Sequence, residues 1–119
     1  MNDKRNIFGG YSSIPWASDG GDKIDKDCFL FTLTNIYNTE PTKFPYVQGR
    51  SIYNKSNFGP YFGLGPDLYC AHNFGNMDFS NFPYSYQDTL GKGKSIFTGN
   101  SSNENKIFSI KEVEVFELI

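Results

Sequence analysis

The chain has 119 residues, the length of one domain and enough to bury a core without metal or disulfide support. Aromatic residues make up 18% of it, which argues against disorder, and the net charge of −2 argues against a nucleic-acid partner. The polar start lacks the apolar segment of a signal peptide, and no apolar run reaches the roughly 18 residues of a membrane span. We therefore expect a cytoplasmic domain that does not insert into membranes.

The first elements follow a polar stretch over residues 1–6, which we expect to form a tail before a single domain at residues 7–119. A strand is predicted at residues 6–8, and Gly9 and Gly10 predict a chain reversal after it, because glycine tolerates positive φ. Residues 28–34 are apolar on both faces, which predicts a central strand. Phe29, Phe31 and Leu33 share one face of it; if Phe31 lies in the core, Phe31→Ala costs about 3–5 kcal/mol.

The later elements are short. Strands are predicted at residues 50–53, 67–71 and 94–97, and residues 113–118 predict a last strand with a bulge where the alternation slips. Ser109 and Glu112 fit a capping box, which predicts a helical turn at residues 109–112. Residues 73–93 predict a long loop. Its expected aromatic anchors are Phe74, Phe79, Phe82 and Tyr84. Short strands between many Gly and Pro turns predict a mostly β, antiparallel fold.

Neither phosphate nor metal chemistry is predicted. Gly93-Lys94-Ser95 matches the end of a P-loop, but Asp88 stands where that motif needs glycine. His72 is the only histidine, and the acidic stretch at residues 19–27 does not match an EF-hand, so a solvated loop is expected there. We expect no cofactor, with weak calcium binding by this stretch as the minor alternative.

Three weaker chemical signals stay open as alternatives. Cys70 and His72 are two residues apart and share a face on a strand, which would suit a thiol-based antioxidant enzyme, whereas Cys28 is expected to be an inert core thiol. Glu112 and Glu114 share a predicted strand face, as paired acids or as charges that protect an edge strand. Trp16 and surface tyrosines would suit a carbohydrate-binding β-sandwich, although core packing is their commoner use.

Five blocks of sequence, in order, resemble a TLDc domain. They are residues 7–16 (IFGGYSSIPW), 27–33 (DCFLFTL), 59–63 (GPYFG), 67–68 (DL) and 108–116 (FSIKEVEVF). The positions that carry the resemblance are Phe8, Gly9, Gly10, Tyr11, Trp16, Phe29, Phe31, Gly59, Pro60, Phe62, Gly63, Asp67, Glu114 and Phe116. The second block resembles the family pattern D-x-F-[LI]-F-[ST]-L, and the last resembles F-x-[VI]-x-[ED]-[VIY]-E-V-[FW].

The resemblance implies an antiparallel β-sandwich with short helical turns at its periphery and no established catalytic mechanism. Domains of this family occur in oxidation resistance proteins and are linked to protection from oxidative stress and to binding the peripheral sector of the vacuolar proton-pumping ATPase. We therefore expect a non-enzymatic protein-interaction module, with Glu112 and Glu114 as candidate interaction residues. The usual family domain has a helix and early strands before the Gly-Gly-Tyr block, so this chain is expected to be a fragment or to close its sandwich differently, for example by pairing with another copy.

Overall fold

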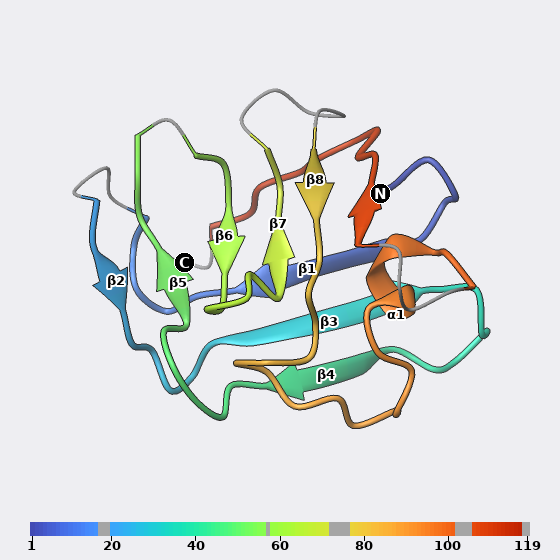
Figure 1. The fold of residues 1–119 in the computed structure, drawn as a ribbon, viewed down its shortest axis with the longest axis horizontal. Coiled ribbons are helices and arrows are strands. Elements are labelled where there is room, and N and C mark those ends of the chain that lie inside the picture. Colours follow the sequence, from blue (N-terminus) through green and yellow to red (C-terminus); the bar gives the residue numbers. More distant parts are fainter. Residues whose placement is uncertain (17–19, 57, 72–76, 102–105, 118–119) are drawn as a thin grey trace.

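The computed structural model describes residues 1–16, 20–56, 58–71, 77–101 and 106–117 (Figure 1). Nine strands and one short helix are assigned within these residues. In chain order they are β1 (Ile7–Tyr11), β2 (Asp22–Lys23), β3 (Phe29–Thr34), β4 (Thr42–Pro45), β5 (Ile52–Tyr53), β6 (Tyr61–Phe62), β7 (Leu68–Tyr69), β8 (Asp78–Phe79), α1 (Ser95–Thr98) and β9 (Ile107–Phe108).

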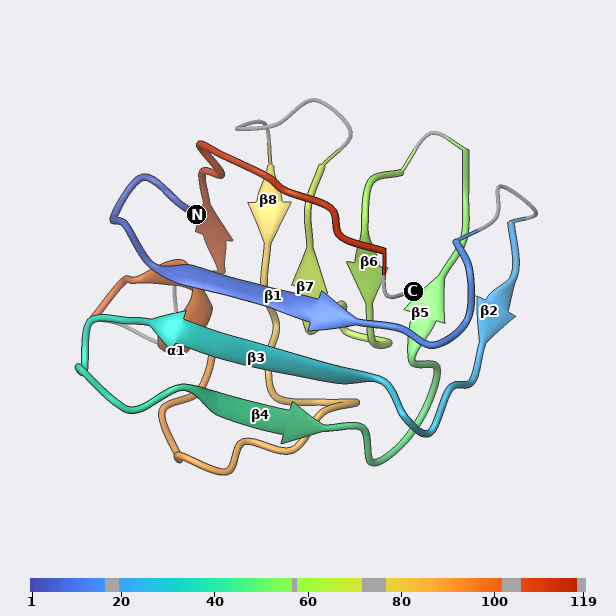
Figure 2. The same cartoon turned by 180° about the vertical axis from the view of Figure 1, so that it is seen from behind.

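The strands form two antiparallel sheets that pack face to face. One sheet has the order β1-β3-β4, and the other has the order β2-β5-β6-β7-β8-β9. The strands of the first sheet run across those of the second rather than along them (Figures 1 and 2), as in an orthogonal sandwich. The prediction of a mostly β, antiparallel sandwich is confirmed. No helix among the described residues has the length and apolarity needed to cross a membrane.

The central position predicted for β3 is confirmed, since it pairs with β1 on one side and β4 on the other. Phe29, Phe31 and Leu33 share one face, as predicted, but this face is not the one that lies in the core. Leu30 and Thr32 are fully buried between the sheets, whereas Phe31 is only half-buried on the opposite face. Consecutive residues of a strand point to opposite faces, so the burial of Leu30 excludes Phe31 from the core.

The core lies between the sheets and is closed at one end by α1. Phe97 of α1 contacts the rings of Phe8, Phe44 and Phe82, with centroid distances of 5.4, 5.7 and 4.9 Å. The strand predicted at residues 94–97 is wrong, because residues 95–98 form α1. All four residues of this helical turn are buried, including Ile96 and its neighbour Phe97.

The end of the chain also differs from its prediction. Residues 113–117 form no strand, and residue 118 lies outside the described residues. The helical turn at residues 109–112 is wrong as well, since Ile110 forms an isolated β-bridge with Asn2. The amides of Lys111 and Glu112 both donate to the carbonyl of Met1, at 2.8 and 3.2 Å. The two ends of the described chain are thus joined by backbone hydrogen bonds.

The first six residues, expected as a tail, pack against the domain. Asn2 and Asn6 are 1% and 2% exposed, and the Asn2 side-chain amide donates to the carbonyls of Phe97 and Thr98. Hydrogen bonding allows such polar groups to be buried. The chain reversal predicted at Gly9 and Gly10 is wrong, because both lie inside β1.

The long loop predicted at residues 73–93 contains β8, so that prediction is wrong for residues 78–79. Of its expected anchors, Phe82 is fully buried and Phe79 is half-buried, whereas Tyr84 is 47% exposed. Phe74 lies outside the described residues. The first two therefore fix the segment, and Tyr84 does not.

Candidate functional site

A groove with a volume of about 1040 Å³ runs beside β1, which we call the β1 groove. One wall is β1 with the outward side chains of β3, and the other is the segment at residues 112–117. Figure 2 shows β1 and this last segment crossing the same side of the molecule. Trp16 and Phe62 also line it.

Gly9 and Gly10 of β1 have no side chain because aromatic rings occupy the space beside them. A Cβ on Gly9 would lie 2.6 Å from Cζ of Phe31, and a Cβ on Gly10 would lie 2.5 Å from Cζ of Phe62. Real Cβ contacts are never this close, so a larger residue would force the rings to move. The Gly-Gly pair thus lets β1 lie directly on the two rings and leaves bare backbone in the groove.

Trp16 is 45% exposed, and its ring meets that of Phe62 edge-on at 5.3 Å. Such a ring could stack on a sugar, but the hydroxyls beside it already have partners. Ser13 Oγ donates to Asp25 Oδ1 at 2.8 Å, and Ser12 Oγ donates to the Ile14 carbonyl at 2.9 Å. The exposed Trp16 ring supports the carbohydrate-binding hypothesis. The hydroxyls of these two serines do not, because both already donate hydrogen bonds within the protein.

Asp25 fixes the chain where it leaves β1, and the prediction of a solvated loop is wrong for it. Its side chain is 5% exposed and accepts hydrogen bonds from the amides of Ser13 and Asp27 at 2.6 and 3.0 Å. Burial works to raise the pKa of Asp25, but the hydrogen bonds from Ser13, Asp27 and Ser12 outweigh it and lower the pKa. No group of three potential metal ligands occurs among the described residues.

The second wall of the β1 groove carries the carboxylates predicted as interaction residues. Glu112 and Glu114 both line the groove and are exposed, although they do not share a strand face. The N-terminal ammonium of Met1 donates to the Glu112 carbonyl at 2.8 Å and holds the start of this wall. Further along, Val115 and Phe116 are 87% and 79% exposed. This wall is therefore acidic and apolar at once.

Two of the sequence blocks meet at a buried carboxylate, that of Asp67. Asp67 is fully buried and accepts hydrogen bonds from the amides of Tyr84, Ser85 and Tyr86, at 2.7–3.2 Å. These amides come from a distant segment of the chain and not from the local turn that contains Asp67. Burial raises the pKa of Asp67 more than these amides lower it. A Cβ on Gly63, whose φ is +83°, would overlap Asp67 Oδ1.

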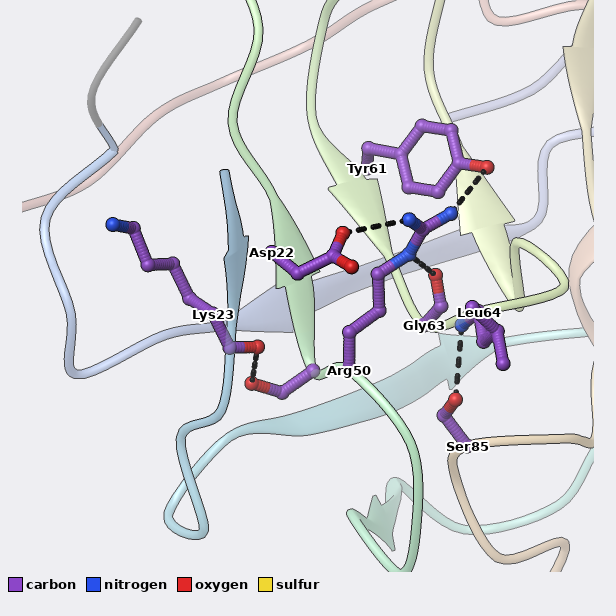
Figure 3. A network of polar contacts seen from close by, with 8 residues as sticks. Asp22, Lys23, Arg50, Tyr61, Gly63, Leu64 and Ser85 are labelled. Atoms are coloured by element: carbon purple, nitrogen blue, oxygen red, sulfur yellow. Dashed lines mark hydrogen bonds and ion pairs between the residues drawn. The ribbon is translucent and has the colours of Figure 1, made fainter. Parts of the chain in front are cut away.

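A cation on the outer face of the larger sheet is fully engaged within the protein (Figure 3). Arg50 donates to Asp22 Oδ1 at 2.7 Å, to the Gly63 carbonyl at 3.2 Å and to the Tyr61 hydroxyl at 3.1 Å. It also lies over the rings of Tyr53 and Tyr61, 4.7 and 5.0 Å from their centroids. Since these partners lie on or beside β2, β5 and β6, Arg50 joins three strands. No motif or spacing in the sequence points to this role of Arg50.

Neither cysteine has the properties of a reactive thiol. Cys28 and Cys70 are both free, and burial raises the pKa of each to about 12. A reactive cysteine needs the opposite shift, because its thiolate is the nucleophile. His72, the base in the thiol hypothesis, lies outside the described residues. The expectation of an inert Cys28 agrees with its burial and with its hydrogen bond to the Tyr11 carbonyl at 2.8 Å.

The family model of the TLDc domain matches residues 1–119 of the chain. No curated protein and no solved structure matches the chain. The family match includes residues 1–6, which pack on α1 in the structure.

Proposed function

The chain belongs to the TLDc domain family, and we propose that it is a non-enzymatic protein-interaction module that binds partners through the β1 groove. The observation that carries this proposal is the apolar surface at the groove. Val115 and Phe116 expose most of their area, and Leu33 is 47% exposed on the opposite wall. Contiguous exposed apolar side chains around a groove are typical of interaction sites.

The partner we propose is the peripheral sector of the vacuolar proton-pumping ATPase, which the family resemblance implies. Binding there would place the domain in the cytoplasm, where free thiols such as Cys28 and Cys70 stay reduced. A role in protection from oxidative stress would then follow from the partner and not from thiol chemistry in this chain.

Substitution of Val115 tests the binding surface. We expect Val115→Asp to reduce the recovery of vacuolar ATPase subunits from a eukaryotic lysate about tenfold, because it places a charge in the apolar contact. Subunits are quantified by mass spectrometry after affinity capture. The melting temperature should stay unchanged, since Val115 is 87% exposed.

Val47→Asp is the matched control. Val47 is 53% exposed and does not line the β1 groove, so the same change of side chain should leave recovery unchanged. Equal recovery with both variants would place the binding surface elsewhere. Recovery of no ATPase subunit above background by the unmodified domain would reject the proposed partner.

A further inference from the structure

β1 presents a sheet edge without a paired strand, and the segment at residues 112–117 runs beside it, across the β1 groove (Figure 2). It pairs with β3 on one side, and no strand among the described residues pairs with its other side. The five residues of β1, IFGGY, include no charged residue and no proline. Proteins usually protect such edges with charges, prolines or very short strands, because an open edge pairs with other chains.

The other sheet edges have this protection. β4, at the opposite edge of the same sheet, has the sequence TKFP and so carries Lys43 and Pro45. The edges of the second sheet, β2 and β9, are two residues long each. β1 is thus the one long, uncharged edge among the described strands.

The β1 groove lies directly beside this edge, and its charged side chains are negative, which favours a partner with basic residues. Three glutamates line it, Glu112, Glu114 and Glu117. No lysine or arginine does, and the ammonium of Met1, which donates to the Glu112 carbonyl, is the one positive group among its lining residues. On the outer face of β1 the ring of Phe31 lies over Gly9, and Leu33 also lines the groove. Phe8 points to the inner face, where it contacts Phe97. A strand seated there would meet apolar side chains along β1 and carboxylates along the opposite wall.

We propose that the β1 groove binds an extended segment of a partner protein, with alternating apolar and basic residues, which adds a strand to the edge of β1. Backbone hydrogen bonds would supply affinity, and the alternate side chains would supply specificity. Apolar side chains would lie against Phe31 and Leu33, and lysines or arginines would approach the three glutamates. This inference rests on the proposed function and names the chemistry of its partner.

A second copy of the chain fits this edge less well. Pairing of two β1 edges would bring the glutamates of both copies toward one interface, and neither β1 contributes a positive charge. Like charges that face each other across strands destabilise their pairing. The occupant therefore comes from a protein with basic residues.

A synthetic peptide of sequence KVKVTVKVK, labelled with fluorescein, tests this inference by fluorescence polarisation. We expect it to bind about tenfold more tightly than EVEVTVEVE, which reverses the charge, and than KVKVPVKVK, which has proline at the centre of the strand. Replacing the three glutamates by glutamine should remove the preference for the lysine peptide over the glutamate peptide. Amide NMR signals of Gly9, Gly10 and Tyr11 should shift on binding.

Equal binding of the three peptides, no binding, or shifts that leave β1 unchanged would overturn the inference. A dimer in sedimentation that the lysine peptide does not dissociate would overturn it in favour of a second copy. The proposed function fails separately. If Val115→Asp abolishes ATPase capture while the peptides do not bind, the groove is an interaction surface that does not add a strand.

Discussion

Gly63 and Asp67 show at the scale of single residues why two sequence blocks occur together. Asp67 holds three amides of residues 84–86, and Gly63 leaves room for its carboxylate. The sequence identifies both positions through the family resemblance. It could not identify the partners, because they lie 17–19 residues away in the chain.

Gly63→Ala should lower the free energy of unfolding by about 2–5 kcal/mol. Its φ of +83° disfavours alanine by about 1–2 kcal/mol, and displacing the buried carboxylate leaves amides without partners at about 1–3 kcal/mol. Urea unfolding followed by tryptophan fluorescence measures the change.

Gly91→Ala is the matched control for that variant. Gly91 has a φ of +70°, and among the described residues no heavy atom lies within 4 Å of a Cβ built on it. Its loss should therefore be only the backbone part, about 1–2 kcal/mol. Equal losses for the two variants would show that Asp67 does not restrict position 63.

At the scale of elements, the sequence predicts a strand well where that strand is central, with a paired strand on each side. β3 is apolar on both faces and is found where predicted. The prediction of a last strand is wrong for residues 113–117. Alternation in a sequence indicates which way side chains would face in a strand, but it does not show whether another strand is available for pairing. The helix α1 could not be predicted, because it has only four residues and all four are buried. So short a segment shows no helical repeat of apolar and polar residues.

The facing of β3 can be tested directly with two adjacent substitutions. Leu30→Ala should cost about 2–5 kcal/mol, because Leu30 is fully buried and would leave a cavity. Phe31→Ala should cost about 1–2 kcal/mol, since its half-buried ring borders the β1 groove. Both losses are measured by urea unfolding. A larger loss for Phe31→Ala than for Leu30→Ala would contradict the structure and place Phe31 in the core.

At the scale of the whole molecule, the two faces that remain outside the core have different properties. On the larger sheet, the outward rings of Tyr53, Tyr61 and Tyr69 contact one another, and Arg50 covers two of them. The contact surfaces of these side chains are therefore largely covered by one another. Beside the smaller sheet, the β1 groove leaves an unpaired strand edge and exposed apolar side chains. Only the second arrangement offers both backbone and apolar surface to a partner.

The central claim is that partners bind at the β1 groove, and amide hydrogen exchange tests it most directly. Exchange is compared between the free domain and the domain bound to the purified peripheral sector of a vacuolar ATPase. The account predicts that exchange slows at residues 9–11 and 112–117. Slower exchange confined to the outer face of the larger sheet, with β1 unchanged, would contradict it.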